Sequence, residues 1–227
     1  MSDVAVVDYG MGNLRSVAKA IEHVAPRLSL EVTSDARQVM RAARVVFPGQ
    51  GAMPDCMREM DARGLREAVL EAARAKPFLG ICIGLQMLFE SSEEGDTPGL
   101  ALLPGRVRRF PADRMTDAQG ARLKVPHMGW NEVRQTVEHP LWRGIPQGSR
   151  FYFVHSYFPV PGGRELTAGE CVYGVPFTCA AARDNVFAVQ FHPEKSAAAG
   201  LRLLANFVEW RPAARRATQK AAASPAA

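Results

Sequence analysis

Cys82 has the sequence context that a cysteine nucleophile needs. It lies between Gly80 and Gly84, after an apolar run over residues 78–81 that predicts a buried strand and before apolar positions at helical spacing. This pattern matches the Gly-x-nucleophile-x-Gly turn, where small neighbours let a strand bend sharply into a helix. The turn exposes the sulfur at the carboxyl edge of the sheet and at a helix N-terminus, where the dipole favours the reactive thiolate. An isolated cysteine is more often a small buried hydrophobic residue, so the rest of the chain has to decide.

A second group of residues can supply the base for this nucleophile. His192 follows a predicted strand over residues 186–190, and Glu194 lies two residues further on. Residues two apart in an extended chain point the same way, and Pro193 stiffens the backbone between them. A carboxylate beside the imidazole sets its tautomer and stabilises the imidazolium. Cys82, His192 and Glu194 are therefore the predicted catalytic triad.

Backbone N–H groups near Cys82 can stabilise the oxyanion that thiol attack creates. Ile83, directly after the nucleophile, offers one N–H at the start of the predicted helix. The loop of Gly49, Gln50 and Gly51 offers others, because glycine lets the main chain approach a ligand closely. Without Cys82, this loop would be just as consistent with an ordinary turn between a strand and a helix.

The first half of the chain predicts alternating strands and helices. Apolar runs beginning at residues 4, 28, 45 and 78 alternate with helical patterns, of which the longest covers residues 54–74. Such alternation implies a parallel sheet covered by helices on both faces, with sites at the carboxyl ends of its strands. Both the glycine-rich loop and Cys82 fall at that edge.

After about residue 95 the pattern changes to short strands joined by tight turns. The predicted strands cover residues 105–110, 129–133, 150–158, 170–175, 177–181 and 186–190, and a closing helix covers 199–210. The predicted fold class is α/β: a single domain with a largely parallel central sheet flanked by helices and a second half richer in antiparallel strands. We expect residues 1–210 to form this domain and residues 211–227, an Ala- and Arg-rich tail, to be disordered.

Composition narrows the function classes. A chain of 227 residues with 47% hydrophobic residues fits one soluble α/β domain. The net charge of +5 comes largely from basic residues of the tail, so no nucleic-acid partner is indicated. The four cysteines lack metal-type spacing, and no apolar run has the length of a secretion signal or membrane span. We expect a cytoplasmic protein with reduced thiols, no bound metal and no membrane partner.

Taken together, these motifs resemble the class I glutamine amidotransferases, which use a Cys-His-Glu triad. Within this class the chain is most similar to the glutaminase subunits of imidazole glycerol phosphate synthase, and the likeness covers about residues 3 to 210. The class motifs are PGQG (48–51), GICIGLQ (80–86) and HPEKS (192–196), and the subunit motifs are DYGMGNL (8–14), PHMGWN (126–131) and YFVHSY (152–157).

The resemblance implies a role for each matching residue. Cys82 would attack the side-chain amide of glutamine, His192 would pass a proton to the departing ammonia, and Glu194 would orient His192. A glutamyl thioester would form and then be hydrolysed. The residues that would hold the amino-acid end of glutamine or line its pocket are Gln86, the backbone of Ser156 and Tyr157, and Gly51.

The resemblance also implies a partner and no cofactor. Ammonia would pass to a (β/α)₈-barrel cyclase subunit in a heterodimer that makes imidazole glycerol phosphate and aminoimidazole carboxamide ribotide for histidine biosynthesis. Trp130, Tyr152 and Lys195 match positions that face this partner. One departure is Gln50, where the family usually has a small apolar residue such as Val. In this subunit type that peptide is thought to reorient before it donates to the oxyanion, so Gln50 bears on gating and not on the chemistry.

Three other functions fit parts of the pattern. Ammonia donation to another synthase, as in anthranilate or pyridoxal phosphate synthesis, is disfavoured by residues 8–14 and 126–131. A non-catalytic scaffold of the same fold would be marked by loss of a triad residue, and all three are present. A thiol hydrolase of larger γ-glutamyl substrates would be separated by comparing glutamine with γ-glutamyl peptides.

Overall fold

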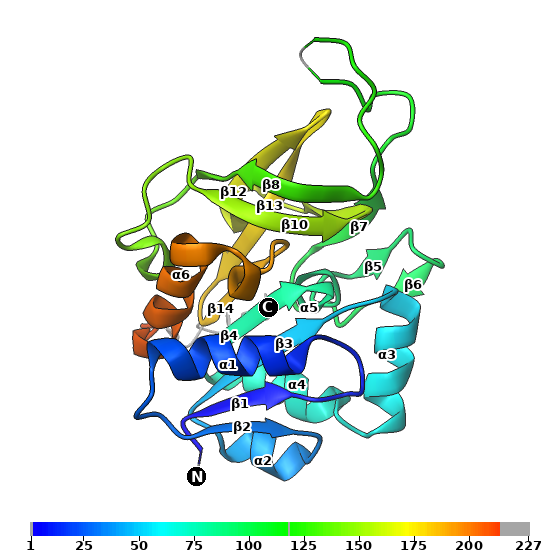
Figure 1. Ribbon diagram of the computed structural model, residues 1–227. Helices are drawn as coiled ribbons and strands as arrows, with labels where there is room; N and C mark the ends of the chain where they lie inside the picture. Colours follow the sequence, from blue (N-terminus) through cyan, green and yellow to red (C-terminus); the bar gives the residue numbers. More distant parts are fainter. Residues whose placement is uncertain (1, 118, 214–227) are drawn as a thin grey trace, which may run out of the picture.

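An eight-stranded sheet forms the centre of the molecule, in the order β2-β1-β3-β4-β14-β13-β12-β9 (Figure 1). The computed structural model describes residues 2–117 and 119–213, so most of the expected tail lies outside the described residues. Five neighbouring strands, from β2 to β14, run parallel, and the last three are antiparallel. In sheet order the strands are β2 Leu30–Thr33, β1 Val4–Val7, β3 Arg44–Gly49, β4 Phe78–Cys82, β14 Val186–Val189, β13 Val175–Arg183, β12 Thr167–Tyr173 and β9 Arg134–Gln135.

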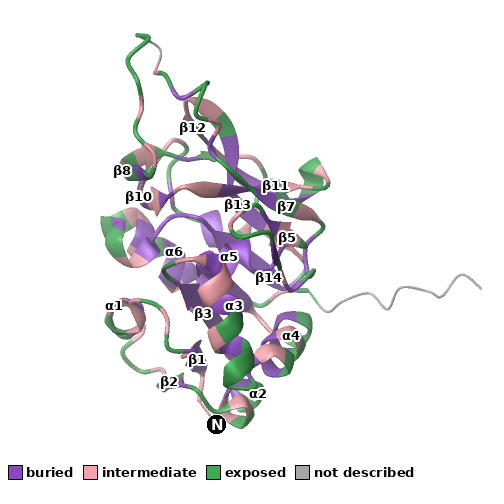
Figure 2. Cartoon of the chain, turned by 90° about the vertical axis from the view of Figure 1, so that its right-hand side faces the viewer, coloured by how far each residue is buried: buried purple, intermediate pink, exposed green. Residues whose placement is uncertain are grey.

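Helices cover both faces of the parallel half. On one face α1 (Leu14–Val24) packs against α6 (Ala197–Glu209), and on the other α2 (Ala36–Arg41) packs against α4 (Arg66–Ala75). Figure 2 shows the central strands between these two layers. Every residue of β1, β3, β4 and β14 is buried, which explains their continuous apolar sequences. The predicted α/β class and parallel sheet are confirmed.

Two smaller sheets come from the second half of the chain. One pairs β10 with β8, and the other has the order β11-β7-β5-β6. Their strands are β5 Ser91–Ser92, β6 Thr97–Pro98, β7 Gly105–Arg109, β8 His127–Glu132, β10 Arg150–His155 and β11 Tyr157–Pro161. The predicted strand over residues 150–158 is therefore two strands, which separate at Ser156 and join different sheets.

Two helix predictions need correction. The helix predicted over residues 54–74 is α3 (Met53–Ala62) followed by α4, because Gly64 takes a left-handed φ of +65° and ends α3 with a glycine cap. The helix predicted after Cys82 is a single turn, α5 (Ile83–Gln86). It stops there because the carbonyl groups that would continue it accept hydrogen bonds from residues 100–103 instead. Among the described residues, no helix is long and apolar enough to cross a membrane.

Candidate active site

Cys82 occupies a strained turn between β4 and α5. Its φ of 56° and ψ of −111° lie outside the regions that most side chains adopt, at a cost of about 1–3 kcal/mol. A Cβ atom on Gly84 would lie 1.8 Å from the carbonyl oxygen of Phe47, so only glycine fits beside the turn. The strand-turn arrangement expected from the glycine spacing is therefore present.

The surroundings of the Cys82 sulfur differ in two ways from the expectation. The residue is only 4% exposed, so the sulfur lies at the floor of a pocket and not at an open edge. Since α5 has one turn, its dipole is small, and the thiolate has to be favoured mainly by neighbouring side chains. The pocket has a volume of about 280 Å³. The predicted site residues that line it are Gln50, Gly51, Cys82, Ile83, Gln86, Ser156, Tyr157 and His192.

His192 and Glu194 form a buried pair on the same pocket. Nδ1 of His192 lies 3.0 Å from Oε1 of Glu194, and the two side chains are 6% and 1% exposed. Burial lowers the pKa of His192, but the neighbouring Cys82 sulfur and then the Glu194 carboxylate raise it to about 10. His192 therefore holds a proton at neutral pH, and a cation beside the sulfur favours the thiolate.

The backbone around His192 is tied to strand β10. The His192 N–H donates to the Tyr152 carbonyl at 2.9 Å, and the Tyr152 N–H donates to Oγ of Ser196 at the same distance. The Ser196 hydroxyl in turn donates to the His192 carbonyl at 2.6 Å. Ser196, which is buried, thus positions the histidine, a role that the sequence did not suggest.

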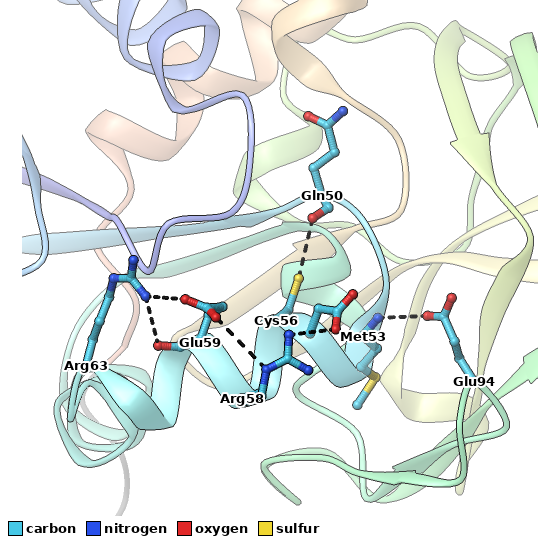
Figure 3. Close-up of polar contacts among 8 residues, drawn as sticks. Gln50, Met53, Cys56, Arg58, Glu59, Arg63 and Glu94 are labelled. Atoms are coloured by element: carbon cyan, nitrogen blue, oxygen red, sulfur yellow. Dashed lines mark hydrogen bonds and ion pairs between the residues drawn. The ribbon is translucent and has the colours of Figure 1, made fainter.

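The glycine-rich loop lies directly beside the nucleophile. Gly49 is the register partner of Cys82 in the parallel pair of β3 and β4. Tyr9 donates from its hydroxyl to the Pro48 carbonyl at 2.7 Å, and the Cys56 thiol donates to the Gln50 carbonyl at 3.5 Å (Figure 3). Burial raises the pKa of Cys56 to about 11, so it remains a thiol donor at neutral pH. Two side chains from different elements therefore hold the carbonyl groups of the loop.

Glu94 is a pocket residue that the sequence analysis missed. It lies in the turn between β5 and β6, and its Oε2 accepts from the backbone N–H of Met53 at 2.8 Å, at the start of α3 (Figure 3). Its side chain lines the pocket together with Cys82. No local motif marks it, because a contact 41 residues away in sequence brings it there.

Gln190 is a second missed residue. Its Nε2 lies 3.7 Å from the Cys82 sulfur, and its Oε1 accepts from Nε2 of Gln86 at 3.0 Å. The same Gln86 nitrogen donates to the Tyr157 carbonyl at 3.1 Å, which defines the orientation of the buried Gln86 amide. Gln190 stands two residues before His192 in extended chain, and this spacing could have indicated a common face.

The three residues expected to face a partner form one cluster. The Trp130 and Tyr152 rings meet edge to face at 6.2 Å between centroids, and Nζ of Lys195 lies 5.8 Å from the Tyr152 ring centroid. Trp130 is 44% exposed, and Met128 on the same face of β8 is 63% exposed. This surface adjoins the triad through the hydrogen bonds of Tyr152.

Comparison with known proteins agrees with this geometry. The model of the family "Glutamine amidotransferase class-I" matches residues 5–210, which places the chain in that class. A putative GMP synthase glutaminase-type chain from Thermoplasma acidophilum superposes with a TM-score of 0.66 at 16% identity, covering 92% of this chain and 93% of the other. The glutaminase domain of a CTPS from Trypanosoma brucei superposes with a TM-score of 0.59 at 15% identity, covering 94% and 96%. At these identities the structures support the fold alone.

Relatives of much higher identity refine the assignment. The imidazole glycerol phosphate synthase subunit HisH of Aromatoleum aromaticum is 69% identical over 93% of this chain and 100% of its own length. That of Nitrosospira multiformis is 65% identical over the same shares. The chain belongs to the family of imidazole glycerol phosphate synthase HisH subunits. The class and the subunit type expected from the sequence are both confirmed.

Proposed function

We propose that this chain hydrolyses L-glutamine as the glutaminase subunit of imidazole glycerol phosphate synthase. The observation that carries the proposal is the convergence of Cys82, His192 and Glu194 at one pocket, from segments far apart in the sequence. A non-catalytic scaffold has no need for a strained cysteine beside a protonated histidine.

The first half of the reaction forms a thioester. The Cys82 thiolate attacks the side-chain carbonyl carbon of glutamine, and the carbonyl electrons move to its oxygen. When the tetrahedral intermediate collapses, the carbon–nitrogen bond breaks and the His192 proton passes to the nitrogen, so that ammonia leaves. Glu194 keeps the imidazole oriented by its hydrogen bond to Nδ1.

The second half restores the enzyme. Water attacks the thioester carbon and gives a proton to His192, the carbon–sulfur bond breaks, and glutamate leaves. Cys82 is again a thiolate and His192 again an imidazolium. Backbone N–H groups of Ile83 and of the loop from Gly49 to Gly51 stabilise the oxyanion in both halves, and losing one such donor typically costs about 100- to 1000-fold in kcat.

The pocket also offers groups for the amino-acid end of glutamine. Glu94 provides a carboxylate that pairs with the α-ammonium group. Oε1 of Gln86 is buried and has no hydrogen-bond partner among the described residues, so it can accept from the same ammonium group. The backbone of Ser156 and Tyr157 lines the pocket opposite the nucleophile's turn and completes the binding site.

Ammonia passes from this site to a (β/α)₈-barrel cyclase subunit in a cytoplasmic heterodimer. The relatives are named as subunits of a synthase, which supports a partner chain. The exposed cluster of Trp130, Tyr152 and Lys195, with Met128 beside it, offers aromatic and apolar surface for that contact. The reaction needs no cofactor, because each step moves only protons and one acyl group.

The test is glutamine hydrolysis by the purified chain with and without the cyclase subunit. We expect glutamate release in the complex and none from a Cys82→Ala complex that still assembles. Unchanged ammonia release from that variant would refute Cys82 as the nucleophile. A preference for γ-glutamyl peptides over glutamine, or purification with a different synthase, would instead favour one of the alternative functions.

A further inference from the structure

Two buried histidines lie beside the pocket and take no part in the triad chemistry. His127 on β8 and His155 on β10 are direct partners in the antiparallel register, where side chains face each other across the strands. Nδ1 of His127 lies 3.0 Å from Nε2 of His155, and both residues are buried. A hydrogen bond between two imidazoles needs one donor and one acceptor, so each ring must have a defined tautomer.

The groups at the two ends of the pair define these tautomers. Nδ1 of His155 lies 2.7 Å from the Tyr157 carbonyl, which can only accept, so this nitrogen carries a proton. At the other end, the Asn131 amide nitrogen lies 3.4 Å from Nε2 of His127 and 2.9 Å from the Val172 carbonyl. Since Nε2 of His127 accepts, its Nδ1 is the donor to His155. Both rings are therefore neutral, with their protons directed toward Tyr157.

Burial agrees with neutral rings. Desolvation lowers the pKa of His127 to about 4, and desolvation is also the main cause that lowers the pKa of His155 to about 3. Neither ring gains a proton near neutral pH, so neither competes with His192 as a proton carrier.

The hydrogen-bond chain ends on a group that also orients the pocket. The Tyr157 carbonyl accepts from His155 and, at 3.1 Å, from Nε2 of Gln86. The second N–H of Gln86 is held by Gln190 at 3.0 Å. With both N–H groups held in this way, Oε1 is the only polar atom that Gln86 can offer to a ligand. A displaced Tyr157 carbonyl would release the amide and remove this definition.

We propose that His127 and His155 are positioning residues: they hold the Tyr157 carbonyl, and through it the Gln86 amide, in the orientation that binds the amino-acid end of glutamine. This inference rests on the proposed glutaminase function and assigns part of its substrate affinity to a chain of side chains that begins on β8. Because the two rings move no proton in the reaction, they set KM for glutamine more than kcat.

The test is steady-state glutamine hydrolysis by the full chain in complex with the cyclase subunit. His127→Phe keeps the ring stacking on Tyr173 and Phe153, at 4.0 and 4.9 Å between centroids, but removes the donor to His155. We expect KM for glutamine to rise about tenfold, as for the loss of one hydrogen bond, with kcat within about twofold. His127→Asn returns an amide N–H near the position of Nδ1, and we expect it to bring KM back to within about threefold of the wild type.

A matched control is His139→Phe, the same substitution in a partly buried ring that stacks on Phe187 and does not line the pocket. It should leave KM unchanged, and equal KM values for His127→Phe and His139→Phe would overturn the proposal. Nitrogen NMR of the wild-type imidazoles adds a readout that needs no variant to fold. Protonation on Nδ1 alone is expected for both rings between about pH 5 and 9, and a proton on Nε2 of either ring would also overturn it. A wild-type complex without glutaminase activity would contradict the proposed function itself.

Discussion

Replacing Glu194 by glutamine tests how the triad carboxylate acts, since the two side chains have the same shape. Glu194→Gln removes a charge from a hydrogen bond of 3.0 Å to His192 that is almost fully buried. Hydrogen bonds to charged groups contribute about 1.5–3 kcal/mol and neutral ones about 0.5–1.5 kcal/mol, so the imidazolium loses about 1–2 kcal/mol of stabilisation. Because about 1.4 kcal/mol corresponds to a factor of ten in rate, we expect kcat to fall about 5- to 30-fold.

The assay is glutamate release by the complex, with KM measured in the same experiment. KM should stay within about twofold, because Glu194 is not among the residues that line the pocket. Glu209→Gln is the matched control, since the Glu209 side chain is 68% exposed and pairs only with an exposed Arg143 in the described structure. A Glu194→Gln enzyme with the kcat of the control would refute the orienting role, and a rise in KM alone would show that the residue binds substrate instead.

Three further substitutions test the supports of the site. Gly84→Ala would place a Cβ atom 1.8 Å from the Phe47 carbonyl oxygen, so thermal unfolding should shift to lower temperature by at least the effect of about 1–3 kcal/mol and glutaminase activity should be lost; an active variant of wild-type stability would contradict the turn geometry. Ser196→Ala removes the hydroxyl that links the His192 carbonyl to β10, and we expect a loss of about 1–3 kcal/mol in the free energy of unfolding and a lower kcat at constant KM, whereas unchanged kinetics would show that the link is dispensable. Cys82→Ala removes the main group that raises the pKa of His192, so an NMR titration should give a pKa well below about 10, and a value that stays near 10 would show that the sulfur is not its cause.

The parallel half of the fold and the cysteine turn could be predicted because their determinants are local. Strands such as β1 and β4 are buried on both faces and read as continuous apolar runs, and the glycines around Cys82 act within two residues. Where local signals competed with tertiary contacts, the prediction was wrong. The turn α5 is the example, because residues 100–103 capture the carbonyl groups that a longer helix would need.

The rest of the site depends on pairings between distant segments. Gln190 reaches the Cys82 sulfur from 108 residues away, and His127 meets His155 only because β8 and β10 pair in one particular register. A one-residue slip in that register would turn the two imidazoles to opposite faces. Residue types and spacing along the chain carry no measure of this register, so these contacts had to come from the structure.

The central claim, that the Cys82 sulfur attacks the amide carbon of glutamine, can be tested by covalent labelling with a diazo-ketone analogue of glutamine. The other three cysteines are buried, and burial raises the pKa of Cys56 to about 11, that of Cys171 to about 12 and that of Cys179 well above its ordinary value. Peptide mass spectrometry of the complex should therefore find one adduct, on Cys82, that glutamine prevents and that forms in step with loss of activity. Labelling of another residue in parallel with inactivation, or an active enzyme with Cys82 fully modified, would contradict the account.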